Sequence, residues 1–279
     1  MSPTAFIIGA GGHIGLAVAN KLKQEGYKVA VGSRNPLQKE GLVPITVDVS
    51  NTDSITNAFA EVKQKLGAAP NVVVFNGSCI HPHPFPNVPH IHLLLSPFTV
   101  AALTFPTTSG DPSTIDLSAV KTSADITVGL FASIQQAITG FRSLPADSPV
   151  SKTFIFTGNR VPFLPRIGPL SDLLSLGLQK VDGAYLAELF HATYEKEGFR
   201  YASLHIRADF GWLYLPNGLY RFYYADENKA DGTPANLDWS ETAHATAYWD
   251  AISRKERGKW YLRFDADGNA LPHDLGDRL

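Results

Sequence analysis

The sequence predicts an α/β protein with a doubly wound parallel sheet, and three observations predict it. Short, continuous apolar runs such as Asn71–Phe75 (NVVVF) are typical of parallel strands covered by helices on both faces. These runs alternate with segments whose apolar residues recur every three or four positions, as in helices. A glycine-rich turn, Gly9–Gly15, joins the first apolar run to the first helical pattern. Together they predict a Rossmann-type fold in three α/β/α layers.

The bulk composition fits one large domain spanning residues 1–279. The chain is 44% hydrophobic, carries a formal net charge of −2 and has no long basic run, so we expect no nucleic-acid surface. Its single cysteine, Cys79, excludes an internal disulfide and favours a reducing compartment. The longest apolar stretch, Ile91–Phe105, is interrupted by polar residues and proline and is too short to span a bilayer. With no secretory signal pattern before the first strand, the expected location is cytoplasmic, with no membrane partner.

The glycine turn is the strongest chemical signal. Ala5–Ile8 reads as a buried strand, Gly9, Gly12 and Gly15 follow at intervals of three, and apolar residues then recur at helical spacing. Such a turn lets the backbone approach a pyrophosphate, which the helix N-terminus favours. The pattern is G-x-x-G-x-x-G; the literal G-x-G-x-x-G fails because Ile14 stands at the third glycine position. The alternative is a tight turn of any α/β protein.

The end of the second predicted strand, 29–31, indicates which dinucleotide the site prefers. An acid there would bind the ribose 2′-hydroxyl of NAD, and none is present. Arg34, with Ser33 beside it, is suited to a 2′-phosphate instead, and His13 in the glycine turn offers a further donor. We therefore expect NADP(H) rather than NADH. The alternative for Arg34 is an ordinary solvated arginine.

Two further strand ends complete a family resemblance. The predicted strand 43–47 ends in VDVS, and Asn71–Phe75 ends in FNGS. With GAGGHIG in the first turn and SRN after the second strand, the chain resembles the short-chain dehydrogenase/reductase family. The resemblance implies contacts to the cofactor from the residues that follow these strands and from the turn, including Ile14, Asp48, Val49, Asn76 and Gly77. Asp48 would contact the adenine ring, although it could equally be an N-cap of the next helix.

The resemblance is weaker for the catalytic residues. The family places a serine after the fifth strand; here the predicted strand Lys152–Thr157 continues into Gly158-Asn159, so Thr157 and Asn159 are the candidates for orienting a carbonyl. The helix predicted over 116–144 carries Ile126 where many members have an asparagine.

The family's Tyr-x-x-x-Lys pair is only half matched. Lys180 fits the family lysine by its spacing from Gly198, and it would bind cofactor and take part in catalysis. Counting back four residues gives Leu176, and leucine donates no proton, so the usual general acid is missing. The alternative for Lys180 is an exposed helix lysine.

In the C-terminal third we expect a sixth strand over residues 201–206 and a substrate lid over residues 207–237. The lid is rich in aromatic residues, which suggests a pocket for an apolar substrate; packing of a long loop is an equally good explanation. Tyr220, Tyr223 and Asp209 are candidates for a relocated acid. The last helix is predicted over 239–252 and the last strand over 259–264.

Residues 79–100 form an unusual segment with five prolines and four histidines. The histidines His81, His83, His90 and His92 lack carboxylate or cysteine partners at useful spacing, so we expect no metal site. Because the resembling family is shorter here, we interpret the segment as an insert, either a surface elaboration or a retained intron.

These observations predict an NADP(H)-dependent oxidoreductase that acts on a small carbonyl, imine or alcohol. Two alternatives remain: a non-catalytic NADP(H)-binding sensor, suggested by Leu176 and Ile126, and a non-redox cyclase or isomerase on the same fold. The resemblance also implies a homodimer or homotetramer formed through the helices over 118–144 and 178–197.

Overall fold

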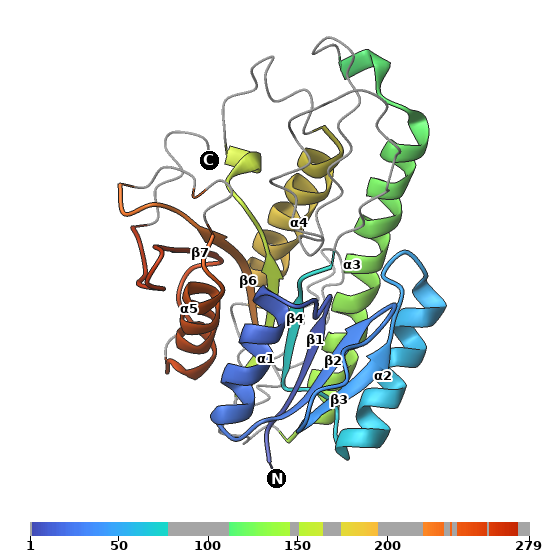
Figure 1. The fold of residues 1–279 in the computed structure, drawn as a ribbon, viewed down its shortest axis with the longest axis vertical. Helices are drawn as coiled ribbons and strands as arrows, with labels where there is room; N and C mark the ends of the chain where they lie inside the picture. The colour runs from blue at the N-terminus through green and yellow to red at the C-terminus, as the bar shows by residue number, and fades with distance from the viewer. Residues whose placement is uncertain are drawn as a thin grey trace, which may run out of the picture.

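A computed structural model describes most of the chain (Figure 1). The described residues are 2–77, 112–145, 151–163, 174–194, 220–231, 235, 239–255 and 257–272. The predicted insert 79–100 and the predicted strand 201–206 lie outside them.

The centre of the fold is one seven-stranded sheet in the order β3-β2-β1-β4-β5-β6-β7. Every pair of neighbouring strands runs parallel, which confirms the predicted fold class. The strands are β1 (Thr4–Ile8), β2 (Lys28–Ser33), β3 (Leu42–Thr46), β4 (Val72–Phe75), β5 (Lys152–Thr157), β6 (Tyr220–Glu227) and β7 (Tyr261–Phe264).

Helices cover both faces of this sheet. α1 and α5 lie side by side on one face, and α2, α3 and α4 pack together on the other (Figure 1). The helices are α1 (Ile14–Gln24), α2 (Thr52–Leu66), α3 (Leu117–Ser143), α4 (Leu174–Thr193) and α5 (Glu241–Ser253), with short 3₁₀ turns η1 (Pro112–Thr114) and η2 (Val161–Phe163).

Alternation along the strands produces two separate cores. In β1, Phe6 and Ile8 face the α2–α3–α4 side, whereas Ala5 and Ile7 face α1 and α5. All four side chains are fully buried, as expected for a strand with helices on both faces.

Among the described helices, α3 is the one long and apolar enough to cross a membrane by length and composition. Its position in the fold accounts for that composition. A stripe that includes Ile126, Leu130 and Ile134 is buried in the core, and the helix packs between α2 and α4.

One prediction about the C-terminal third is wrong. Residues 220–227, expected within a substrate lid, form β6, which pairs with β5 and β7 inside the sheet. The aromatic residues of this segment alternate between the two cores: Tyr223 packs toward α5, and Phe222 and Tyr224 pack toward α4. Their bulk therefore fills the interior, and the rest of the expected lid lies largely outside the described residues.

The packing of α3 supplies a first prediction. A Cβ added at Gly129 would meet the backbone oxygen of Val49 at 1.8 Å, so the helix approaches the loop after β3 only because this position has no side chain. We expect Gly129→Ala to lower the free energy of unfolding by about 2 kcal/mol or more. Urea unfolding followed by circular dichroism measures it.

Gly177→Ala in α4 is the matched control. Its added methyl would lie 3.7 Å from Val161, an ordinary contact, so the better helix propensity of alanine should raise stability by up to about 1 kcal/mol. Equal effects of the two substitutions would contradict the account of the α3 packing.

Candidate functional site

The carboxyl edge of the sheet collects the predicted site residues. The strand order reverses between β1 and β4, and a crevice outside the carboxyl ends of the strands at such a reversal is where open α/β sheets bind ligands. The register pairs Ile8 with Gly32 and with Phe75, and Phe75 with Phe156. The residues that follow are therefore neighbours in one row along this edge: Ser33, Gly9, Asn76 and Thr157.

The glycine turn is built by close backbone approach. Gly9 has a φ of +78°, and a Cβ there would meet the backbone of Asn76 at 2.6 Å and of Gly77 at 2.7 Å. The Asn76 side-chain amide donates to the Gly9 carbonyl at 3.0 Å. A Cβ at Gly15 would lie 2.7 Å from Ala10, so the helix begins directly against the turn. Both ends of the turn thus require glycine.

The N-terminus of α1 differs from those of α2, α3 and α5. Asn51, Asp116 and Ser240 accept hydrogen bonds from backbone N–H groups at the starts of α2, α3 and α5. The residue at the same position of α1, His13, makes no side-chain cap bond. The first N–H groups of a helix have no partner within the helix, and a helix N-terminus that no side chain caps is suited to an anion.

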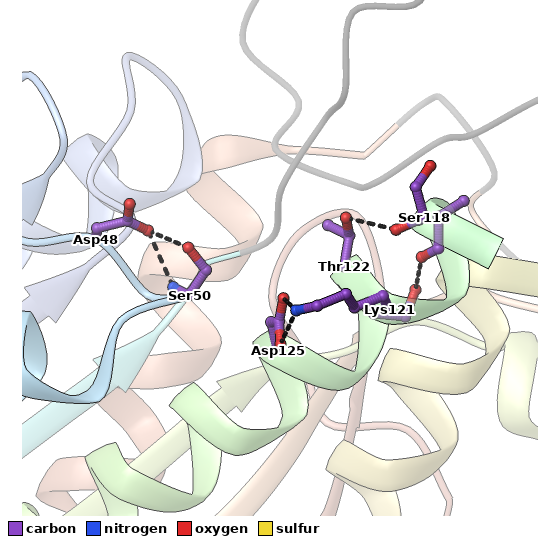
Figure 2. A network of polar contacts seen from close by, with 8 residues as sticks. Asp48, Ser50, Ser118, Lys121, Thr122 and Asp125 are labelled. Carbon is purple, nitrogen blue, oxygen red and sulfur yellow. Dashed lines mark hydrogen bonds and ion pairs between the residues drawn. The ribbon is translucent and has the colours of Figure 1, made fainter. Parts of the chain in front are cut away.

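A polar corner lies at the ends of β2 and β3. Arg34 is exposed after β2, and the Asp48 carboxylate accepts from the Ser50 N–H at 3.0 Å and the Ser50 hydroxyl at 2.7 Å (Figure 2). Partial burial would raise the pKa of Asp48, but the Ser50 hydrogen bonds and the nearby Arg34 charge outweigh it and lower that pKa. Asp48 is therefore an anion at neutral pH. The alternative that it caps α2 is wrong, because Asn51 is the N-cap.

Val49 and Gly77 lie next to Asp48 and Asn76, in the loops that follow β3 and β4. A Cβ at Gly77 would lie 3.1 Å from Val49 Cγ1, so the loops after β3 and β4 are in close contact. Figure 2 shows the Asp48 loop beside the first turns of α3, where Lys121 and Asp125 form an exposed ion pair at 2.8 Å. The structure thus brings the predicted residues of β1, β2, β3 and β4 together.

Lys180 reaches the same edge from α4. It is buried, and its Nζ donates to the Thr157 carbonyl oxygen at 2.8 Å and lies 4.7 Å from the centroid of the Phe156 ring. Burial lowers the pKa of Lys180 to about 8, against a smaller opposite effect of the Asp226 charge. The alternative of an exposed helix lysine is therefore wrong.

Thr157 and Asn159 occupy different environments. The Thr157 hydroxyl accepts a hydrogen bond from the hydroxyl of Tyr248 in α5 at 2.9 Å, so Thr157 is contacted by Lys180 on one side of the sheet and Tyr248 on the other. The Asn159 side chain accepts from the Val161 N–H at 3.1 Å, and its backbone is bonded to the Tyr224 hydroxyl. Asn159 thus fixes the turn after β5, whereas Thr157 is held by α4 and α5 at the end of the strand.

The structure describes two of the three candidates for a relocated general acid. Tyr220 pairs with Lys152 at the start of β5 and β6, the end of the sheet opposite the candidate site. The hydroxyl of Tyr223 is bonded to the Arg257 carbonyl oxygen on the α5 side. Neither tyrosine lies at the carboxyl edge, so both proposals are wrong; Asp209 lies outside the described residues.

Sequence reasoning missed a buried polar group beside the site. Asp226, near the end of β6, accepts from the Tyr261 hydroxyl at 2.6 Å, and Arg160 donates to that hydroxyl at 3.0 Å. Burial raises the pKa of Asp226, although its hydrogen bonds and the two nearby arginines, Arg160 and Arg263, oppose the shift. An acid inside an aromatic run is a weak signal in a sequence, because only the pairing of β6 with β5 and β7 brings these partners together.

Leucine and isoleucine stand at the two positions where the family resemblance places a tyrosine and an asparagine. Leu176 is buried one turn before Lys180 on α4, and Ile126 is buried on α3. Among the residues that the structure describes, no group of three or more His, Cys, Asp or Glu is arranged to hold a metal ion; the four histidines of the insert lie outside them.

The comparison with known proteins fits this geometry. A family model described as short chain dehydrogenase matches residues 3–91. Over 266 residues the chain is 32% identical to the short-chain dehydrogenase/reductase dmxR12 of Cryptosporiopsis sp. (strain 8999), a match that covers 94% of this chain and 92% of that protein. The chain belongs to the short-chain dehydrogenase/reductase family. Members of this family are oxidoreductases that bind a nicotinamide cofactor and act on small molecules.

Solved members of the short-chain dehydrogenase/reductase family share the fold at low identity. A short-chain dehydrogenase/reductase of Serratia marcescens superposes with a TM-score of 0.60 at 14% identity, covering 95% of this chain and 96% of its own. The 3-ketoacyl-(acyl-carrier-protein) reductase of Brucella melitensis, solved with NADH, gives 0.60 and 14%, covering 95% and 97%. A stretch of 67 residues, 24% of this chain, is also similar to a 3-oxoacyl-[acyl-carrier-protein] reductase, MabA of Mycobacterium avium, with 36% identity over 26% of that protein.

The low pKa of Lys180 predicts a pH-dependent stability. Between about 8, its value in the folded protein, and 10.5, its ordinary value, the unfolded chain holds a proton on Lys180 that the folded protein has lost. The free energy of unfolding should therefore rise with pH across this interval through Lys180. The difference between wild type and Lys180→Met, measured by urea unfolding from pH 7 to 11, should grow in favour of wild type. A difference that stays constant with pH would show that Lys180 titrates normally.

Proposed function

We propose that this protein is an NADP(H)-dependent oxidoreductase that transfers hydride between the cofactor and a small carbonyl, imine or alcohol. The observation that carries the proposal is the uncapped N-terminus of α1 directly behind the Gly9 turn, at the reversal of strand order. The turn has no room for a Cβ at Gly9 or Gly15, and it leaves backbone N–H groups for a pyrophosphate, so these residues fit a dinucleotide.

The remaining predicted residues supply the other cofactor contacts in this proposal. Arg34 and Ser33 hold the 2′-phosphate at the end of β2, and Asp48 with Val49 borders the adenine. Asn76 and Gly77 contact the cofactor between its adenosine and nicotinamide halves. Lys180 has three N–H donors, one of which is used by the Thr157 carbonyl, so it can also reach a ribose hydroxyl.

The chemistry divides between the cofactor and the chain. The bound nicotinamide supplies or accepts the hydride. In this proposal Thr157 holds the substrate oxygen through its hydroxyl, and the described residues contain no assigned proton donor. Leu176 is buried where the family resemblance places a tyrosine, which keeps a non-catalytic cofactor-binding sensor as the second candidate function.

A titration tests the cofactor assignment. Nicotinamide fluorescence should show tight binding of NADPH and weaker binding of NADH to the purified protein. Arg34→Met should weaken NADPH binding by about tenfold, equivalent to about 1.4 kcal/mol, and leave NADH binding nearly unchanged.

Lys63→Met is the matched control, because it removes the same charge from an exposed position in the last turn of α2, at the other end of the sheet. The 2′-phosphate assignment fails if both variants change the NADPH affinity equally. Absence of binding by either cofactor would overturn the whole proposal. Oxidation of bound NADPH by added carbonyl compounds would support the oxidoreductase proposal over the sensor alternative.

We also propose a homo-oligomer formed through α3 and α4. The large hydrophobic side chains that are exposed among the described residues all lie on these two helices: Leu117, Val128, Phe131, Leu178, Val181, Tyr185 and Leu189. On α4 they form one stripe at helical spacing, which a second copy of the same face would cover.

The oligomer makes a direct prediction. Tyr185→Glu combined with Leu189→Glu places two charges on the stripe, so the protein should become a monomer in sedimentation velocity experiments. Asn57→Glu, on the exposed side of α2, should keep the wild-type mass. The interface is refuted if wild type is already a monomer at tens of micromolar or if the doubly charged variant keeps its oligomeric mass.

A further inference from the structure

We propose that Asn76-Gly77 is a site of spontaneous covalent modification, at which Asn76 loses its side-chain amide and becomes aspartate or isoaspartate. Asn76 directly follows β4 at the carboxyl edge of the sheet, and its side chain closes the contact with the Gly9 turn. Its conversion releases the turn from the strand. The reaction needs no ligand, so it takes place whether or not the protein binds a dinucleotide.

The residue pair itself favours the reaction. Asparagine followed by glycine closes a succinimide ring readily, because glycine has no side chain to hinder the approach of its amide nitrogen to the asparagine side chain. The sequence has two such pairs, Asn76-Gly77 and Asn217-Gly218, and the first lies among the described residues. Asn76 is half-buried at the end of its strand, so water has access for the hydrolysis that follows.

The attacking nitrogen is not held by the sheet. The Asn76 N–H donates to the carbonyl oxygen of Ile8 at 2.8 Å, which continues the bonding between β1 and β4. Within the described part of the chain the next N–H, that of Gly77, donates to no acceptor, although Gly77 is buried. Buried N–H groups without a partner are rare in folded proteins. An amide nitrogen must lose its proton before it attacks, and here no hydrogen bond from the described residues holds that proton in place.

The reaction is complete with water as its only co-reactant. The Gly77 nitrogen loses its proton to a base in the solvent and forms a bond with Cγ of Asn76, while the bond from Cγ to Nδ2 breaks and Nδ2 leaves as ammonia. Water then adds to one of the two carbonyl carbons of the succinimide. Opening on one side gives aspartate at this position. Opening on the other side gives isoaspartate, in which the main chain runs through the former side-chain carbons.

Either product removes the hydrogen bond that joins the turn to β4. Asn76 Nδ2 donates to the Gly9 carbonyl oxygen at 3.0 Å, and because a carbonyl oxygen only accepts, the amide nitrogen is essential. A carboxylate in its place sets an acceptor against an acceptor. Isoaspartate also lengthens the main chain where there is no room for it, since a Cβ on Gly9 would lie 2.7 Å from the Gly77 nitrogen. Modification therefore separates the turn from the strand.

Peptide mass spectrometry of the full chain, aged without ligand at mildly alkaline pH, tests the site. We expect conversion of Asn76 in the folded protein, with isoaspartate distinguished by its fragmentation. Gly77→Ala should slow the conversion by roughly tenfold or more, because its methyl group hinders the attack. That methyl group would lie 3.1 Å from Val49 Cγ1, so a small side-chain shift admits it. Asn51, which is followed by threonine, should keep its amide in the same digest. A parallel sample aged in urea measures the rate in the unfolded chain, where Asn76 and Asn217 should convert alike.

A pair of asparagine-to-aspartate variants tests the consequence. Asn76→Asp should lower the thermal midpoint and speed hydrogen–deuterium exchange in the peptide that contains the Gly9 turn by roughly tenfold. Asn51→Asp is the matched control, because the Asn51 side chain accepts from the Ser54 N–H at 3.0 Å and aspartate accepts equally well at a helix N-terminus. If Asn76→Asp does not fold, aged wild type separated by anion exchange carries the same change, made in the folded state.

Survival of the Asn76 amide in the folded protein, over a time in which the urea-aged chain converts, would overturn the assignment of the site. Equal rates in wild type and Gly77→Ala would do the same, because the Gly77 nitrogen would then not be the nucleophile. Wild-type exchange in the glycine turn of Asn76→Asp or of the aged protein would show that the turn does not depend on the amide. NADPH is absent from every sample, so a failure of the proposed function would leave these results unchanged.

Discussion

The contact between the Gly9 turn and the end of β4 is the constraint on which the candidate site depends. The two backbones approach so closely that a single Cβ at Gly9 would lie 2.6 Å from Asn76, and the Asn76 side chain closes the gap by donating to the Gly9 carbonyl. The close approach of Gly15 to Ala10 then places the start of α1 directly against the same turn. The strand order reverses at the same point, which is where open α/β sheets bind ligands.

The end of β5 connects the glycine turn and the end of β4 with residues from α4 and α5. Thr157 lies beside Asn76 along the carboxyl edge, and it is contacted by Lys180 from α4 and by Tyr248 from α5. Two further glycines allow close packing here, Gly158 between β5 and β6 and Gly183 between α4 and β5. A Cβ at Gly158 would meet the Tyr224 ring at 2.2 Å, and one at Gly183 would meet the Phe156 ring at 2.1 Å. Helices on both faces of the sheet are thereby fixed against one strand end.

The N-terminal half of the fold could be predicted from the sequence because its signals are local. A run such as Asn71–Phe75 is apolar throughout, and a strand buried on both faces needs such a run. The same logic failed for β6. The buried Arg221 side chain of β6 donates hydrogen bonds to the carbonyl oxygens of Ala251, Arg254 and Lys255. The Asp226 carboxylate accepts a hydrogen bond from the Tyr261 hydroxyl. These partners come from other elements, so the segment reads in isolation as a polar, aromatic loop.

The candidate site could be predicted in part for a similar reason. Glycines, Arg34, Asp48 and Asn76 follow strands directly, and parallel strands bring their carboxyl ends to one edge. Tyr248 contacts Thr157 and Glu241 contacts His13 from a helix far along the chain, and nothing in the spacing of α5 indicates which strand end or turn it meets. Sequence patterns therefore predicted which strand-end residues lie close together better than they predicted the partners that α5 contributes.

Hydrogen–deuterium exchange with and without NADPH is the most direct test of the account. We predict that NADPH slows exchange in the peptides that contain the glycine turn with the start of α1, the end of β2 and the ends of β3 and β4, because those backbone groups form the cradle. The body of α2 and the C-terminal half of α5 should be unchanged. Protection confined to other parts of the chain, or none at saturating NADPH, would contradict the claim that the Gly9 turn binds the cofactor.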